Sequence, residues 1–204
     1  MYAAGDAACS GLNGAGALPG NRLLDALSGG SSSGNHASEW VKDQSFSNTD
    51  NLLASLESCE TDFSAKFSKE ATDTVQRVGA LDTKLLSIAA KFTSSPNSSD
   101  ELSGMIQELE QAGKLAEAIH LDQQSLIANT NYASLLRIQA GIRLLTASVR
   151  ASLARNESRG VHQRSDFLEE NPELIHHITV DNDANVGTLA VRKGQKDNWI
   201  LAPQ

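Results

Sequence analysis

The sequence has 204 residues, of which 40% are apolar and 4% are aromatic. It contains 17 Lys and Arg residues and 25 Asp and Glu residues, so its formal net charge is −8. An acidic chain of this kind lacks the clustered positive charge that binding to nucleic acid phosphates or anionic membrane surfaces requires, which excludes nucleic acid as a main partner.

Cysteine content and hydropathy restrict the class further. Cys9 and Cys59 are the only cysteines, too few for a disulfide framework or a four-cysteine metal site. No apolar run approaches the roughly 18 residues that a membrane helix needs. The N-terminus has no basic segment typical of a signal peptide. We therefore expect a cytoplasmic protein that inserts into no membrane and is peripheral to one only through a partner subunit.

The first forty residues are dense in Gly, Ala and Ser. Met1–Ala4 is interpreted as the end of a strand, followed by an acidic turn residue, Asp6, and a glycine-rich loop. A helix is predicted to begin near Asn21, because Asn is a good N-cap and leucines that share one helical face follow it. The glycines and serines of Gly29–Gly34 weaken the second half of this helix.

The pattern changes to amphipathic helices from Thr49 onward. Apolar residues spaced by three and four predict four helices, over about Leu52–Phe67, Val78–Phe92, Leu102–Ile127 and Tyr132–Arg155. The third is expected to break or bend near its internal glycine, Gly113. Short loops between such helices imply antiparallel packing in a bundle.

The helical period stops after Arg155. Apolar and polar residues alternate in Ile178–Val180 and Thr188–Val191, with turn-forming residues between them. This pattern predicts a small β-hairpin, which Trp199–Leu201 could extend. The expected fold class is mainly α: a three- to four-helix bundle with a small C-terminal β-hairpin.

The glycine-rich loop matches no general phosphate-binding motif. A dinucleotide fingerprint needs G-x-G-x-x-G directly after a strand; Gly14 and Gly16 supply two glycines, but the third position falls on Pro19. No Gly-Lys-Ser/Thr follows, so a Walker loop is excluded. On these rules alone the loop is a flexible turn before a helix.

Two segments nevertheless match longer patterns. Tyr2–Asp6 and Gly11–Leu24 match in part the order tyrosine-alanine-x-glycine-acid, glycine-x-histidine-glycine-alanine-asparagine-arginine, asparagine-serine-leucine. Arg155–Phe167 contains E-S-R-G-x-H-x-R-x-D-[FY] after a long predicted helix. Together these segments resemble the C-terminal portion of the succinate dehydrogenase, fumarate reductase and L-aspartate oxidase flavoproteins.

The resemblance implies an FAD-dependent oxidoreductase subunit that acts on a dicarboxylate. It implies that Asp6 hydrogen-bonds the ribityl chain of FAD. It also implies that the helix starting near Asn21 points its N-terminus at the flavin ring. Unpaired N–H groups of Arg22, Leu23 and Leu24, together with the helix dipole, would stabilise negative charge on the ring. We identify no catalytic residue and no metal ligand in this chain.

The chain departs from the family pattern where the substrate is bound. The resemblance implies an arginine that grips a substrate carboxylate, and Ala17 stands at that position. The motif's histidine is Asn13, its asparagine is Gly16, and its serine is Arg22. Whether Arg22 replaces the missing arginine stays open. Two alternatives therefore remain: a catalytically degenerate helical interaction module, or part of an L-aspartate oxidase-like enzyme.

The resemblance also implies a division of the chain and a set of partners. Residues 1–40 would be a remnant of the FAD-binding domain, 41–165 a helical bundle domain, and 166–204 an extended tail with the hairpin. The Rossmann-type FAD domain and the capping domain would come from the rest of a longer protein or from a partner subunit. An iron–sulfur subunit would be a further partner. We expect the chain alone to bind FAD weakly or not at all and to be inactive by itself.

The second motif and the histidines each allow a simpler interpretation. The charged residues of Arg155–Phe167 could form a solvated helix end with local ion pairs. The resemblance instead implies that they pack the helical domain against the flavin domain, a structural rather than catalytic role. The other four histidines show no metal-ligand spacing and are interpreted as surface or interface residues: His36, His120, His176 and His177.

Overall fold

The computed structural model describes residues 1–11, 13–46, 48–68, 77–94, 96–119, 121, 125, 127–193 and 199–203. The chain divides into two units, Met1–Glu57 and Ser58–Gln204. Within the described residues, no helix is both long enough and apolar enough to cross a bilayer.

The first unit contains a short 3-10 helix, η1 (Gly5–Ala8), the helix α1 (Asn21–Val41) and the first half of α2 (Thr49–Ser68). The strand end expected at Met1–Ala4 is wrong for the described residues. Ala4 has extended torsions (φ −144°, ψ 161°), but the chain then turns directly into η1. A strand needs a hydrogen-bonded neighbour, and none is present in the described part of this unit.

Small residues let η1 lie against α1. Gly5 has φ +60°, and a Cβ added to it would lie 3.2 Å from Cβ of Ala26. A Cβ added to Gly29 would lie 3.6 Å from Cβ of Ala4. Glycines lower helix propensity, but α1 continues through them. At least one of them, Gly29, lies where the preceding chain approaches the helix closely.

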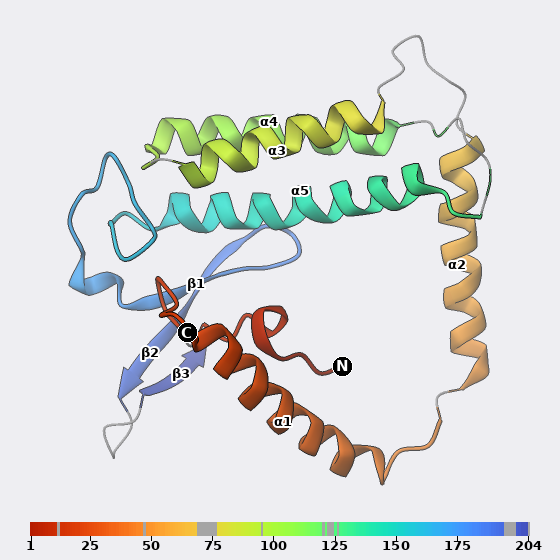
Figure 1. Cartoon of the computed structure of the whole chain (residues 1–204), viewed down its shortest axis with the longest axis horizontal. Helices are drawn as coiled ribbons and strands as arrows, with labels where there is room; N and C mark the ends of the chain where they lie inside the picture. Colours follow the sequence, from red (N-terminus) through yellow and green to blue (C-terminus); the bar gives the residue numbers. More distant parts are fainter. Residues whose placement is uncertain are drawn as a thin grey trace. The chain divides into compact units, whose positions relative to one another are not determined.

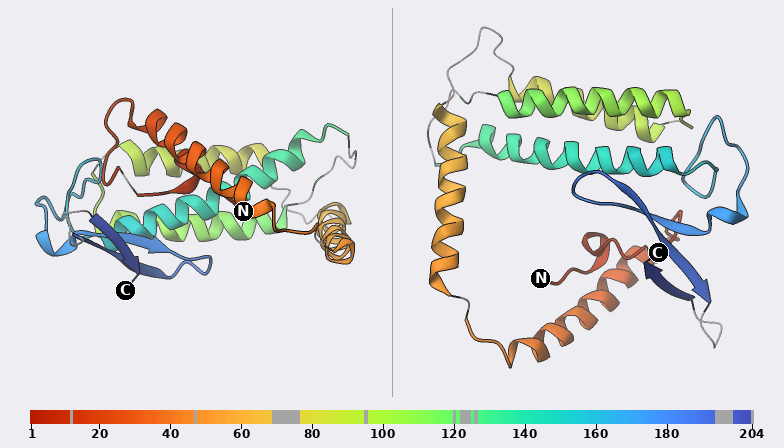
Figure 2. Two further views of the ribbon diagram at one scale, coloured as in Figure 1. Left: turned by 90° about the horizontal axis from the view of Figure 1, so that it is seen from below. Right: turned by 180° about the vertical axis from the view of Figure 1, so that it is seen from behind.

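The second unit is built on three antiparallel helices, α3 (Val78–Ser94), α4 (Ser99–Ala118) and α5 (Thr130–Ala154) (Figure 1). The view from behind in Figure 2 shows the same three helices side by side. Their buried apolar side chains, together with Ile119 and Leu121 after the end of α4, form one core: Leu81, Leu85, Ile88, Leu102, Met105, Leu109, Ala112, Ala116, Leu135, Ile138, Ile142 and Val149. The mainly α fold predicted from periodicity is confirmed.

A three-stranded antiparallel sheet follows the helices. It comprises β1 (His176–Val180), β2 (Val186–Lys193) and β3 (Trp199–Pro203), in the order β1-β2-β3. Val180 lies opposite Val186, so the connection is a short turn. Strands β1 and β2 lie against α5 (Figure 1). The predicted hairpin and its third strand are both confirmed.

The expected bend in the third helix is wrong. Helix α4 continues through Gly113 and ends at Ala118, where Ile119 takes ψ 131°. A Cβ added to Gly113 would come within 4.0 Å of the Ile142 side chain, so the glycine lies where α4 contacts α5. Ile127, expected to continue this helix, is 85% exposed in the connection to α5.

Helix α4 begins with a capping box. The Ser98 hydroxyl accepts a hydrogen bond from the backbone N–H of Glu101 (3.3 Å), and the Glu101 carboxylate accepts one from the N–H of Ser98 (2.7 Å). Replacing Ser98 by Ala should therefore lower the free energy of unfolding by about 1 kcal/mol. Urea denaturation measures the change. The control is Ser103→Ala within α4, which should shift stability by less than about 0.5 kcal/mol; equal effects would contradict the assignment.

Candidate functional site

The glycine-rich loop of the first unit is formed by two tight turns. In the first, the N–H of Gly14 donates to the carbonyl of Gly11 (3.0 Å); in the second, the N–H of Asn21 donates to the carbonyl of Leu18 (3.1 Å). Gly11, Gly14 and Gly20 have φ of +68°, +57° and +85°. Residues with a side chain rarely adopt such angles, so the turns depend on glycine at these positions.

Helix α1 begins at Asn21, as predicted, but its N-cap differs from the prediction by one residue. The N-cap is Gly20 rather than Asn21, because its left-handed backbone leads the chain into the helix. Among the described residues no side chain caps this terminus. The N–H of Leu24 donates to the carbonyl of Gly20 (3.0 Å). Helix geometry therefore gives the N–H groups of Arg22 and Leu23 no acceptor within α1, so they point out of its N-terminus.

The predicted cofactor residues all lie in this first unit. Asp6 is exposed on η1, which packs on α1, while Arg22, Leu23 and Leu24 are exposed on the first turn of α1. The arrangement offers a carboxylate acceptor, an uncapped helix N-terminus and a loop of small residues. These groups fit a flavin: the carboxylate suits a polyol chain, and helix amides suit the electron-rich edge of the ring.

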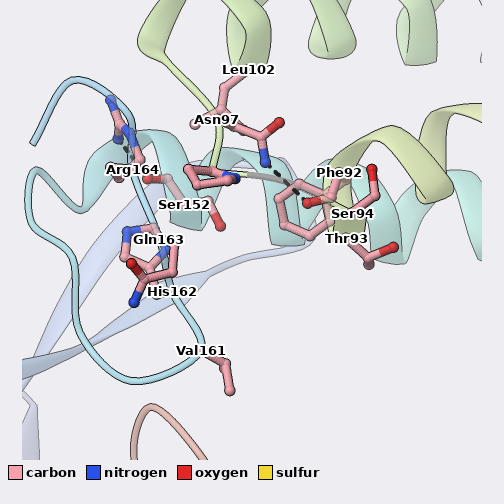
Figure 3. Close-up of a pocket in the computed structure, with 11 residues that line it drawn as sticks. Phe92, Thr93, Ser94, Asn97, Leu102, Ser152, Val161, His162, Gln163 and Arg164 are labelled. Atoms are coloured by element: carbon pink, nitrogen blue, oxygen red, sulfur yellow. Dashed lines mark hydrogen bonds between the residues drawn. The ribbon is translucent and has the colours of Figure 1, made fainter. Parts of the chain in front are cut away.

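The second motif forms a buried charged cluster, here called the Arg164 junction. It comprises Arg155, Glu157, Ser158, Arg159, Arg164 and Asp166. The segment that carries it pairs with the connection between α3 and α4. The N–H of Asn97 donates to the carbonyl of Gln163 (3.3 Å), and the N–H of Ser165 donates to the carbonyl of Asn97 (3.2 Å). The Asn97 side chain in turn donates to the carbonyl of Phe92, near the end of α3 (3.0 Å; Figure 3).

Arg164 joins the ends of two helices. Its side chain is 1% exposed, and its Nη1 donates to three carbonyls at the end of α5, those of Ser152, Leu153 and Arg155. These carbonyls form the negative end of the helix dipole, which favours a cation. Asp166 pairs with the same guanidinium through both carboxylate oxygens.

Asp166 has the complementary role at the start of α4. Its carboxylate accepts hydrogen bonds from the N–H and the hydroxyl of Ser99, at 2.8 and 2.6 Å. The bond from Arg164, followed by those from Ser99, lowers the pKa of Asp166 far below its ordinary value. The carboxylate thus lies at the positive end of one helix and the guanidinium at the negative end of the next.

Glu157 is the anionic centre of the junction. Its side chain is fully buried, and its oxygens accept bonds from Arg155, from Arg159 and from the N–H of Asn171. Burial raises the pKa of Glu157, but the bonds from Arg159, Asn171 and Arg155 outweigh it and lower the pKa to about 2. Arg155 also donates to the carbonyls of Leu174 (2.9 Å) and His176, which ties β1 to the end of α5.

The structure of the junction decides against one of the two interpretations of this motif. The solvated helix end is wrong, because Glu157 and Arg164 are buried. Their charged groups are all engaged in holding helix ends and loop, which is a structural role. His162 is held the same way, with Nε2 3.2 Å from the carbonyl of Arg155. Burial lowers the pKa of His162, so its neutral form is favoured.

A pocket of about 550 Å³ borders the junction (Figure 3). Its walls include Phe92, Leu102, Val161 and His162. The buried charge on its wall, Arg164, is committed to helix carbonyls and Asp166, so the pocket offers no such group to a ligand. Among the described residues no group of three His, Cys, Asp or Glu side chains could hold a metal ion; His120 lies outside them.

Sequence reasoning missed the partners of the junction. Asn97 and Ser99 had no motif of their own, and Ser99 meets Asp166 across 67 residues of chain. In the sequence they lie only in the connection between the helices predicted over Val78–Phe92 and Leu102–Ile127. Their role depends on the antiparallel packing of α4 and α5, which brings the start of one helix to the end of the other.

Comparison with known proteins identifies the class. Residues 87–200 match the family model described as "Fumarate reductase flavoprotein C-term". The match covers more than half of the chain, and the chain belongs to this family. It corresponds to the C-terminal part of a flavoprotein subunit of the fumarate reductase and succinate dehydrogenase type.

Individual relatives agree with this assignment. The chain is 27% identical over 198 residues to the fumarate reductase flavoprotein subunit of Mycobacterium tuberculosis, covering 94% of this chain and 33% of that protein. It is 29% identical over 173 residues to the succinate dehydrogenase flavoprotein subunit of Rickettsia conorii, covering 85% and 28%. The chain therefore spans about a third of the length of the curated relatives it matches.

Solved structures show the same fold. FrdA of Escherichia coli quinol fumarate reductase, in a mutant form, superposes with a TM-score of 0.78 at 19% identity, covering 92% of this chain and 32% of that one. The Mycobacterium smegmatis Sdh1 complex in its apo form gives 0.70 at 20% identity, covering 100% and 32%.

Proposed function

We propose that this chain contributes the C-terminal part of an FAD-dependent oxidoreductase that acts on a dicarboxylate. The observation that carries the proposal is the first unit: an exposed carboxylate on η1 and an uncapped helix N-terminus beside a loop of small residues. Membership of the flavoprotein family supports it. FAD, when bound, supplies the hydride chemistry, and the protein supplies orientation and electrostatics.

Each candidate residue has a defined role in this proposal. Asp6 accepts hydrogen bonds from the ribityl hydroxyls. The backbone amides of Arg22 and Leu23 face the electron-rich edge of the flavin, with Asn21 at the first helical position. Leu24 contributes through its position on the first turn, since its own N–H is bonded to Gly20.

The proposal includes the division of the chain and its partners. Residues 1–40 belong to the FAD-binding region, 41–165 to the helical domain and 166–204 to the tail with the sheet. The nucleotide-binding and capping regions come from the rest of the protein or from a partner subunit. An iron–sulfur subunit receives the electrons and brings the assembly to the membrane surface. Relatives described as reductase and dehydrogenase subunits support this assembly.

A second candidate function rests on one observation. The loop from Gly14 to Gly20 carries no charged side chain, and Ala17 stands where the resemblance places a substrate-binding arginine. A catalytically degenerate interaction module, or an L-aspartate oxidase-like enzyme with another substrate contact, would fit this loop. Flavin bound without reduction by any dicarboxylate or by L-aspartate would favour the module.

The cofactor role of Asp6 can be tested directly. The chain is co-expressed with the polypeptide that supplies the nucleotide-binding region, and bound FAD is titrated in wild type and Asp6→Asn. A lost charged hydrogen bond of about 1.5–3 kcal/mol should weaken FAD binding roughly 10- to 100-fold. The matched control is Asp43→Asn, an exposed acid after α1, which should bind FAD as wild type does. Equal affinity in both variants would contradict the role of Asp6.

A further inference from the structure

The two asparagines that flank the glycine-rich loop are joined by a side-chain hydrogen bond. Nδ2 of Asn21 donates to Oδ1 of Asn13 at 3.1 Å. Both side chains are partly buried, whereas most of the intervening loop is exposed. The bond spans eight residues and joins the first helical turn of α1 to the turn that begins the loop.

This bond is a side-chain contact that ties the two turns together. Each turn is closed by its own backbone bonds: Gly14 to Gly11 and Gly16 to Asn13 in the first, and Asn21 to Leu18 in the second. Between them the residues are Gly14, Ala15, Gly16, Ala17, Leu18, Pro19 and Gly20, none with a side chain that forms hydrogen bonds. The orientation of the loop against the helix N-terminus must therefore be fixed from its ends.

We infer that Asn13 and Asn21 form a clamp that positions the loop Gly14–Gly20 against the flavin-facing N-terminus of α1. This inference rests on the proposed function for its ligand, but the clamp itself is a property of this chain. Both asparagines are positioning residues, because they act through the backbone of the loop. A planar ring can approach this backbone closely only if the loop is narrow and held in one conformation.

The direction of the hydrogen bond gives a matched pair of variants. Asn13→Asp keeps the acceptor oxygen, so the clamp stays. Asn21→Ala removes the side-chain amide, so that no rotation of the Asn13 amide can restore the bond and the clamp opens, while alanine, the best helix former, preserves α1. The two variants thus have opposite predicted effects on the clamp, and a loss of α1 cannot account for the second.

The first readout is amide hydrogen exchange of the full chain without cofactor. The hydrogen-bonded amides of Gly14 and Gly16 should exchange about fivefold faster in Asn21→Ala than in wild type, the ratio that a net hydrogen bond of about 1 kcal/mol gives. Asn13→Asp should exchange as wild type does. Equal exchange in all three proteins, or faster exchange in Asn13→Asp alone, would overturn the clamp.

The second readout is the reduction potential and visible spectrum of FAD in the co-expressed assembly. Asn21→Ala, which adds no charge beside the ring, should shift both. Bound flavin with identical spectra and potentials in wild type and Asn21→Ala would overturn the link between clamp and flavin while leaving the proposed function intact. Absence of flavin from the wild-type assembly would instead overturn the proposed function, with the exchange result still deciding the clamp.

Discussion

Replacing Arg164 by Met should destabilise the second unit by about 4 kcal/mol, in the range for removing one partner of a buried ion pair. The guanidinium is 1% exposed and satisfies three carbonyls at the end of α5 as well as the carboxylate of Asp166. The variant leaves those carbonyls without their donor and Asp166 without its cation. Because domains are stable by only about 5–15 kcal/mol, the loss should be visible as a large drop in urea midpoint.

The control for Arg164 is another arginine whose ion pair lies on the surface. Arg137 donates to Asp82 at 2.7 Å, with the two side chains 64% and 27% exposed. Exposed pairs contribute about 0.2–1 kcal/mol, so Arg137→Met should unfold close to wild type. Similar losses in the two variants would contradict the buried role of Arg164.

Replacing Glu157 by Gln should change how stability depends on pH. The folded pKa of Glu157 is about 2, against an ordinary value of 4.5. A carboxyl with a lowered pKa contributes stability that is fully present above pH 4.5 and is lost as pH falls through 2. At about 1.4 kcal/mol per pKa unit, this contribution is about 3 kcal/mol. In the Gln variant it should be absent at all pH values, because the amide cannot ionise.

The measurement is the free energy of unfolding at pH 7, 4 and 3. Wild type should lose stability steeply over this range, and Glu157→Gln should start lower and fall less. Some decline should remain, because Asp166 and His162 also have lowered pKa values and lose stability in the same direction. The control is Glu110→Gln, whose side chain is 55% exposed in its pair with Arg150. A wild-type slope in the Glu157 variant would contradict the assignment.

The spacing of apolar residues predicted most of the fold, because the same spacing places the side chains that form the core. Leu81, Leu85 and Ile88 recur at three- and four-residue spacing on α3, and burying such a stripe against neighbouring helices leaves few alternatives. The prediction was wrong where a glycine was interpreted by propensity alone. Gly113 lowers the propensity of α4 but lies at a close helix contact, which the sequence of one helix does not reveal.

The candidate site was predictable only as far as local motifs reach. The start of α1 at Asn21 was predicted correctly, but the cap is Gly20 because backbone conformation, rather than side-chain type, decides that position. In the second motif the sequence identified the charged residues but did not predict that they are buried. Arg164 becomes a helix-end partner only after α4 and α5 pack antiparallel, and nothing in its own neighbourhood of sequence specifies those distant partners.

Bound flavin tests the central claim most directly. The chain is purified alone and together with the polypeptide that supplies the nucleotide-binding region, and the flavin absorbance band is compared at equal protein concentration. The account predicts little or no flavin in the chain alone and near-stoichiometric FAD in the co-purified assembly. Near-stoichiometric FAD in the chain alone, or none in the assembly, would contradict the view that this chain supplies one part of a shared flavin site.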